Sequence, residues 1–199
     1  MLNPFQKTIS KKIEFTGIGL HSGLESAVKI IPAGENHGIV FKRTDLEQNN
    51  TIKANFENVS SAKLCTTIQN NSNVSISTVE HLLAALYITG IDNALIEINA
   101  TEVPIMDGSS KEFVETILKI GAKEQNIKRK YLKILKNFEF KDNERFISIE
   151  PNKDSLKGTL RVSNPNYNYS GNELNYHLSS AAIDKTTTSG FKNTIYSTG

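Results

Sequence analysis

The chain has 199 residues, a net charge of +2 and 38% hydrophobic residues, a balance that is typical of globular proteins and excludes a disordered or fibrous one. The lysines are scattered, so we expect no nucleic-acid partner. The single cysteine, Cys65, excludes an internal disulfide and fits a reducing cytoplasm or any other compartment where a lone thiol is harmless. Residues 1–12 hold no apolar core of signal-peptide length and no later stretch is long enough to span a bilayer, which predicts a cytoplasmic protein without a transmembrane segment.

The first part of the chain is predicted to alternate strands and loops. Residues 12–16 alternate polar and apolar side chains, as a strand does when one face is buried. We interpret the glycine-rich stretch 17–23 as a tight turn between strands, with His21 at its tip able to face a cleft. A dinucleotide-binding loop would have to open a helix, whereas the residues after this turn look extended. Further strands are predicted at 27–31, 38–42, 51–54, 64–68 and 74–76.

Two helices are predicted next, and each begins with the Ser-x-x-Glu pattern of a capping box, in which serine and glutamate satisfy two free backbone N–H groups. A glycine, which is common just past a helix end, follows each of them. The helices are expected at 78–89 and 110–120, the boxes at Ser77–Glu80 and Ser109–Glu112, the stops at Gly90 and Gly121, and a buried strand at 93–99.

The remaining chain is predicted to begin a second domain. Residues 121–130 are polar and are interpreted as a linker, so we place a first domain at 1–125 and a second at 126–199. Its strands are expected at 131–135, 138–141, 146–150 and 159–163, followed by a loop at 164–175. No helix is predicted to cover this second sheet, so the sequence indicates an α+β protein whose second domain is incomplete.

The adjacent residues Glu80 and His81, near the start of the first helix, are candidates for chemistry. On a helical wheel His81 falls opposite the apolar stripe and beside two alanines. The stripe consists of Val79, Leu82, Leu83, Leu86 and Tyr87. Zinc hydrolases need a neutral imidazole as a ligand and a carboxylate that takes a proton from water. The alternative is structural: Glu80 completes a capping box, and His81 is a buried, hydrogen-bonded histidine.

The other candidate residues do not complete a metal site on spacing alone. A catalytic zinc uses three protein ligands, and His21, His37 and His177 form no convincing helical pair of ligands at i and i+4. Asp107 stands in an Asp-Gly turn signal and is interpreted as a turn or cap residue rather than a catalytic acid. Cys65 has no assignable His–Asn or His–Asp set, so we do not expect it to be a nucleophile.

Six strings of residues stand in a fixed order along the chain, at 16–23, 41–46, 64–67, 76–86, 90–93 and 102–109. Together they resemble the UDP-3-O-acyl-N-acetylglucosamine deacetylase family, from near residue 5 to about 150. The resemblance implies zinc-dependent hydrolysis of the acetamide of an acylated UDP-N-acetylglucosamine, the committed step of lipid A synthesis. It also implies a fold of two similar domains, each a β-sheet packed on a pair of α-helices, with the active site between them.

The resemblance assigns roles to residues in both parts of the chain. By the family pattern, His81 is expected to be a zinc ligand and Glu80 the general base that activates the metal-bound water. Three further residues are expected to line the cleft near the substrate, namely His21, Leu64 and Cys65.

The second part of the chain matches the family less closely. The family carries an Ala-Arg-Thr-Phe-Gly-Phe string whose threonine steadies the developing oxyanion. Its nearest match is 186–191, in which Thr188 is expected to be that catalytic residue and Phe191 a substrate contact, while Thr187 and Ser189 replace the Arg and the first Phe. The family supplies two more zinc ligands and a general-acid histidine further on, so we expect this chain, which ends at Gly199, to be truncated.

Three interpretations stay open at this point. The first is a deacetylase seen as a partial chain. The second is a degenerate, non-catalytic relative that binds an acylated nucleotide sugar or a partner. The third, made without the resemblance, is an α+β binding module with no enzyme activity.

Overall fold

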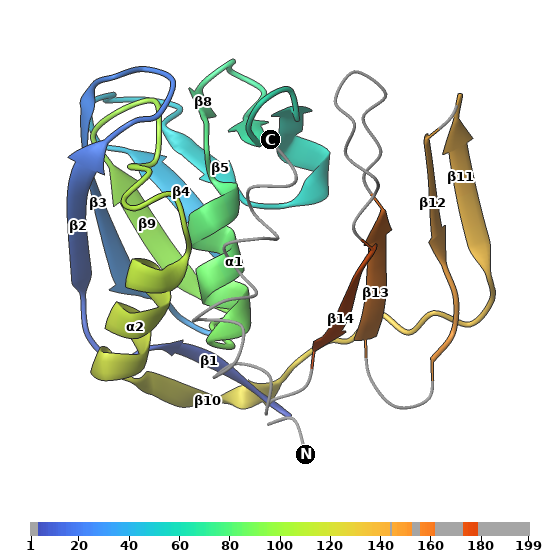
Figure 1. Cartoon of the computed structure of the whole chain (residues 1–199). Helices are drawn as coiled ribbons and strands as arrows, with labels where there is room; N and C mark the ends of the chain where they lie inside the picture. Colours follow the sequence, from blue (N-terminus) through green and yellow to red (C-terminus); the bar gives the residue numbers. More distant parts are fainter. Residues whose placement is uncertain (1–3, 144, 153–155, 162–172, 179–199) are drawn as a thin grey trace. The chain divides into compact units, whose positions relative to one another are not determined.

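The computed structural model describes residues 4–143, 145–152, 156–161 and 173–178 (Figure 1). The chain divides into two compact units, and the first boundary between them lies between Arg129 and Lys130. Thr188 and Phe191, which the sequence analysis assigned to catalysis and substrate contact, lie outside the described residues, as does the side chain of His177.

The described part of the first unit is built on a five-stranded sheet. Along the sheet, β2 (Ile13–Ile18) is followed by β3 (Glu25–Pro32), β9 (Ala94–Ile98), β4 (Ile39–Arg43) and β5 (Thr51–Lys53). Neighbouring strands are antiparallel except β4 and β9, which are parallel. Successive side chains of a strand point to opposite faces, so Ile13 and Phe15 are buried while Glu14 and Thr16 are exposed.

Two helices, α1 (Glu80–Ile88) and α2 (Lys111–Ile120), lie side by side over one face of this sheet (Figure 1). Their buried side chains join those of the strands in a single apolar core. The rings of Phe15 on β2 and Phe113 on α2, for example, meet edge to face with centroids 4.8 Å apart. The predicted α+β class is confirmed.

The helix ends follow the prediction, but the capping boxes do not form. Gly90 and Gly121 end the helices with positive φ angles of 72° and 82°, conformations that glycine adopts at little cost. At the starts, Val79 and Ser110 are the N-cap residues, and neither caps its helix through its side chain. The Ser110 hydroxyl instead donates to the carbonyl oxygen of His81, 2.8 Å away, which joins α2 to α1.

The polar stretch predicted to be a linker is a strand. β10 (Ala122–Lys128) pairs antiparallel with β1 (Phe5–Ile9), a strand that the sequence analysis did not predict. Most of its side chains are exposed, so it shows no apolar alternation and its order depends on backbone pairing. Gln125 adds a side-chain contact, because its Oε1 accepts a hydrogen bond from the amide of the buried Asn93 at 2.7 Å.

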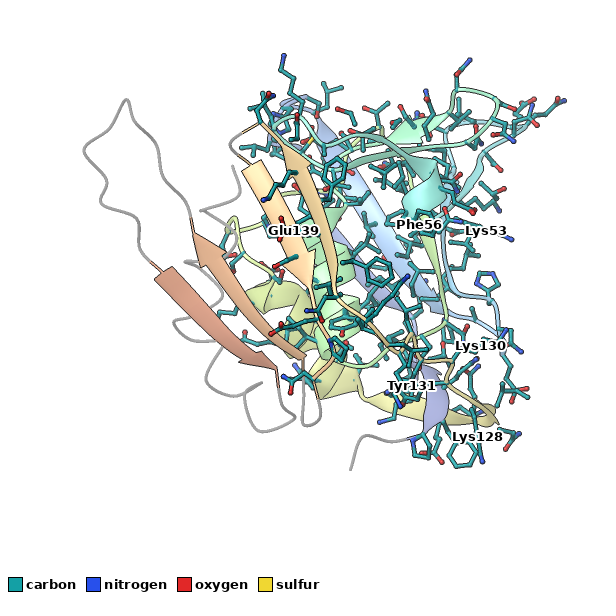
Figure 2. All side chains as sticks on the ribbon, turned by 90° about the vertical axis from the view of Figure 1, so that its right-hand side faces the viewer. Lys53, Phe56, Lys128, Lys130, Tyr131 and Glu139 are labelled. Atoms are coloured by element: carbon teal, nitrogen blue, oxygen red, sulfur yellow. The ribbon has the colours of Figure 1, made fainter. Side chains whose placement is uncertain are left out.

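A small three-stranded sheet, β6 (Val59–Ser61), β7 (Thr67–Gln69) and β8 (Ser75–Ile76), completes the first unit together with the short 3-10 helix η1 (Phe56–Asn58). Phe56 extends into solvent with 85% of its surface exposed (Figure 2). The strand predicted at 64–68 begins only at Thr67, because Leu64 has a left-handed φ of 66° that no strand residue adopts.

In the second unit the described residues form two hairpins, β11 (Phe138–Asp142) with β12 (Arg145–Ile149) and β13 (Leu156–Arg161) with β14 (Glu173–Leu178). The expected strand at 131–135 is wrong, since those residues pair with no strand and most of their side chains are exposed. The expected loop at 164–175 is wrong at its end, where β14 begins. In the first hairpin, Phe138 lies opposite Ile149 and Phe140 opposite Ile147, and all four side chains are exposed.

Candidate functional site

The site is centred on the first two residues of α1. The Oε2 atom of Glu80 accepts the backbone N–H of Thr66 at 3.0 Å, and the N–H of Val79 donates to the carbonyl of Thr66 at 3.3 Å. The glutamate carboxylate is therefore directed at the segment before β7 rather than back at its own helix start. This is why the capping box predicted for Glu80 does not form.

His81 is buried at the same helix start. Only 8% of the residue is exposed, its Nε2 lies 4.0 Å from Oε1 of Glu80, and its Nδ1 has no hydrogen-bond partner among the described residues. Burial lowers the pKa of His81 below its ordinary value of 6.5, although the carboxylates of Glu80 and Asp107 act to raise it. The imidazole is therefore neutral at pH 7, which is the form that binds a metal ion.

His81 is buried, although the helical wheel placed it opposite the apolar stripe of α1. The buried residues of the helix are His81, Leu82, Ala85 and Leu86, whereas Tyr87, expected in the apolar stripe, is 71% exposed. The difference arises because α1 packs against both the sheet and α2, so its buried face is wider than one stripe and includes the histidine. The expectation of a hydrogen-bonded histidine is also not met for Nδ1.

A buried glutamate that the sequence analysis missed, Glu102, lies behind this helix start. Only 1% of it is exposed, and it accepts the hydroxyl of Thr78 at 2.7 Å and the N–H groups of His21 and Ser22 at 3.0 and 2.7 Å. Burial raises the pKa of Glu102, but the hydrogen bonds from His21, Ser22 and Thr78 outweigh it and hold the pKa below its ordinary value of 4.5. The sequence did contain one indication that this residue is buried, because Glu102 stands between the predicted buried strand 93–99 and the apolar Val103.

The three residues expected to line a cleft are connected to the site by hydrogen bonds of their own or of neighbouring backbone groups. Leu64 and Cys65 immediately precede Thr66, whose N–H binds Glu80; Leu64 is 72% exposed and Cys65 is half-buried. The side chain of His21 is exposed, and its backbone is joined to Thr78 through Glu102. The structure thus brings these residues to the start of α1, and their contact with a substrate stays a prediction.

Asp107 is the turn residue that its sequence predicted. Its Oδ1 accepts both the N–H of Ser109 at 2.9 Å and the hydroxyl of Ser109 at 2.7 Å, and these contacts shape the turn before α2. The negative charge of Asp107 also raises the pKa of His81, so the turn acts on the site through its electrostatics.

The fit of these residues to a zinc ion depends on the donors that they offer. Among the described residues, no group of three or more His, Cys, Asp or Glu side chains is placed to hold a metal. His81 fits as a single ligand, since its Nδ1 is buried and has no other partner in the described part of the chain. The described residues thus supply one imidazole and an adjacent carboxylate.

The fold and the site define an α+β protein with a carboxylate and a neutral imidazole side by side, the pair of groups that hydrolases use for acid–base chemistry. The chain belongs to the UDP-3-O-acyl-N-acetylglucosamine deacetylase family, because the family model described as UDP-3-O-acyl N-acetylglycosamine deacetylase matches residues 6–196. The resemblance found in the sequence is confirmed.

Curated relatives carry the same family name. A UDP-3-O-acyl-N-acetylglucosamine deacetylase of Shewanella violacea is 39% identical over 196 residues, which cover 96% of this chain and 64% of that protein. The corresponding proteins of Shewanella frigidimarina and Shewanella denitrificans are 46% and 45% identical over 147 residues, 74% of this chain and 48% of each relative. The chain therefore spans between about half and two thirds of the length of these relatives. Within its described residues, no helix is long and apolar enough to cross a membrane.

Proposed function

We propose that this chain is part of a zinc-dependent enzyme that removes the acetyl group from an acylated UDP-N-acetylglucosamine in lipid A synthesis. The observation that carries the proposal is the pair at the start of α1, where Oε1 of Glu80 lies 4.0 Å from the buried imidazole of His81. The names of the curated relatives supply the substrate class, UDP-3-O-acyl-N-acetylglucosamine.

The proposal gives each member of the pair one task. His81 would hold zinc through its neutral imidazole, and zinc when bound would supply a Lewis acid that makes water acidic enough to act near pH 7. Glu80 would accept the proton of that water. Its Oε2 is occupied by the N–H of Thr66, which fixes the carboxylate and leaves Oε1 on the side of His81.

The remaining assignments extend this proposal. His21, Leu64 and Cys65 would line the cleft, Thr188 would stabilise the oxyanion, and Phe191 would contact the substrate. Residues 1–125 and 126–199 would belong to two similar domains, the second of them partial. The enzyme would work in the cytoplasm, on a substrate that carries an acyl chain.

The test is acetate release from UDP-3-O-acyl-N-acetylglucosamine by the 199-residue chain, with and without added zinc, together with zinc retention measured by elemental analysis. We expect Glu80→Gln and His81→Ala to lose at least about 100-fold in turnover, as loss of a general base or a ligand does. Glu112→Gln, in the exposed first turn of α2, is the matched control and should behave as wild type.

Two results would change the proposal. Zinc-dependent release that survives in Glu80→Gln would remove Glu80 from the role of base. A chain that binds the UDP-sugar, retains no zinc and releases no acetate would be either a partial deacetylase that needs ligands from outside these residues or the non-catalytic relative that the sequence left open.

A further inference from the structure

The carboxylate of Glu102 stands between the glycine-rich loop and the start of α1. Its Oε1 accepts the Thr78 hydroxyl at 2.7 Å and the N–H of His21 at 3.0 Å, and its Oε2 accepts the N–H of Ser22 at 2.7 Å. Hydrogen bonds to a charged acceptor are stronger than neutral ones, and this acceptor is almost fully buried. One side chain therefore joins two segments that are far apart in the sequence.

The loop is shaped to close over this carboxylate. A Cβ atom added at Gly19 would lie 2.5 Å from Oε2 of Glu102 and 2.3 Å from Oγ of Ser22, so no other residue fits there without a shift. The loop is closed on itself as well, because Gly23 donates to the carbonyl of Gly19 at 3.0 Å and Gly19 donates to that of Leu24 at 2.9 Å. The loop is therefore held by hydrogen bonds within itself and by its contacts with Glu102.

The other end of the contact is a strained residue. Thr78 has a φ of 57°, a left-handed conformation that is unfavourable for a β-branched residue and persists only where its surroundings hold it. Thr78 is buried, and its hydroxyl is the group that Glu102 binds. Glu80 follows two residues later, so the conformation of Thr78 sets the direction in which α1 begins.

We propose that Glu102 is a positioning residue, which holds the His21 loop and the start of α1 as one rigid unit and thereby fixes the orientation of Glu80 and His81. The meaning of that orientation rests on the proposed function. The contacts themselves do not, so the two ideas can be tested apart.

Backbone amides already report on each part of this arrangement. The amides of His21 and Ser22 report on the loop, because Glu102 is their acceptor. The amide of Thr66 reports on Glu80, because it donates to the Oε2 of that residue at 3.0 Å. The amide of Ile96, in the central strand β9, reports on the core. Hydrogen exchange and chemical shifts of these amides can be measured by NMR on the whole chain without zinc or substrate.

Three variants separate the contributions. Glu102→Leu removes every acceptor. Glu102→Gln keeps an oxygen in the place of Oε2, which accepts the N–H groups of Ser22 and His21 at 2.7 and 3.2 Å. Its amide nitrogen, in the place of Oε1, can donate to the Thr78 hydroxyl, which rotates to accept. Thr78→Val keeps the shape of the residue and removes only the hydroxyl that joins α1 to Glu102. Glu97→Gln, on β9 at a surface ion pair with Lys42, is the control.

We expect exchange at His21 and Ser22 to become at least tenfold faster in Glu102→Leu, with a displaced Thr66 signal, and both effects to be reversed only in part in Glu102→Gln, which lacks the charge. Thr78→Val should leave the loop amides protected and still displace the Thr66 signal. Ile96 should exchange as in wild type in Thr78→Val and in Glu97→Gln.

A Thr66 signal that stays in place in both Glu102→Leu and Thr78→Val would overturn the proposal, since Glu102 would then hold only its own loop. If Glu102→Leu also accelerates exchange at Ile96, that variant weakens the fold as a whole. The Thr66 signal in Thr78→Val then tests the proposal by itself. Failure of wild type to release acetate would count against the proposed function and would leave these amide measurements unaffected.

Discussion

The first unit and the β11–β12 hairpin share an alternating pattern of apolar and polar residues but differ in how far the apolar side chains are buried. Both contain strands with alternating apolar residues, but Phe41 on β4 of the central sheet is fully buried, whereas Phe140 in the hairpin is 68% exposed. The central sheet is covered by α1 and α2 (Figure 1), whereas the apolar side chains described for the hairpin are exposed and none of them belongs to the apolar core. An alternating pattern therefore predicts a strand, but the apolar side chains are buried only where a second layer, such as a pair of helices, packs on the sheet. The candidate site lies in the first unit, which has such a layer.

The largest expected effect is on the core itself. Phe113→Ala should lower the free energy of unfolding by about 3–5 kcal/mol, because it removes a fully buried ring that meets Phe15. Phe140→Ala, the matched change in the hairpin, should alter it by less than about 0.5 kcal/mol. Urea denaturation measures both, followed by NMR signals of the first unit for Phe113→Ala and by signals of the hairpin for Phe140→Ala. Equal losses in the two variants would show that the hairpin face is covered in solution and would remove the contrast.

The second effect concerns the polar interior of the first unit. The pKa of Glu102 is held below its ordinary value of 4.5, so its charged form stabilises the fold above that pH, and this stabilisation is lost as the pH falls through the lowered value. Glu102→Gln keeps the geometry but replaces charge-assisted hydrogen bonds, so we expect it to cost about 1–2 kcal/mol at pH 7. The difference between wild type and variant should shrink below pH 4.5. A difference that is constant between pH 7 and pH 3 would contradict this role of the charge.

The sequence predicted an element well where the residues that define it are close together in the chain, and poorly where they are far apart. The two helices were predicted to within about two residues, because Gly90 and Gly121 mark their ends locally. The strand β10 was missed because its exposed side chains carry no pattern, and only its pairing with β1 makes it a strand.

The candidate site shows the same limit. Glu80 and His81 were identified from their neighbours and the family strings, but the burial of His81 depends on elements packed around α1, such as Ser110 at the start of α2, which a helical wheel cannot contain. Glu102 was missed because its donors lie about 80 and 24 residues away in the sequence, and a single glutamate gives no local sign of three such partners.

A third effect, of about the same size as that of Glu102→Gln, concerns the conformation of the backbone at one glycine. Gly121 ends α2 with a φ of 82° and a ψ of 167°, a conformation essentially restricted to glycine, and an added Cβ would meet only Oγ of Ser10 at 3.7 Å. Gly121→Ala should therefore cost about 1–3 kcal/mol through strain and not through a clash. Gly34→Ala is the control, since its Cβ would meet nothing within 4 Å and its φ is not left-handed; it should be neutral or stabilising by up to about 1 kcal/mol. Thermal unfolding compares the pair, and equal melting temperatures would refute the strain at Gly121.

The smallest effect tests the edge of the first unit, where β10 joins the core. Arg129 donates from Nε to both carboxylate oxygens of Asp92 at 2.8 and 2.9 Å and from its guanidinium to the carbonyl of Gly90, while Asp92 also accepts the N–H of Lys7 at 2.7 Å. The pair is partly exposed, so Arg129→Ala should cost only about 1 kcal/mol.

The position of the loss matters more than its size. In Arg129→Ala, amides of β10 should exchange faster while the amide of Ile96 in β9 stays protected, because β10 depends on backbone pairing and end contacts whereas β9 lies inside the core. Arg129→Lys keeps the charge but not the planar fork, so it should restore only part of the protection. Uniform acceleration across β10 and β9 would show that this edge unfolds together with the core, and the described part of the first unit would then be one cooperative structure.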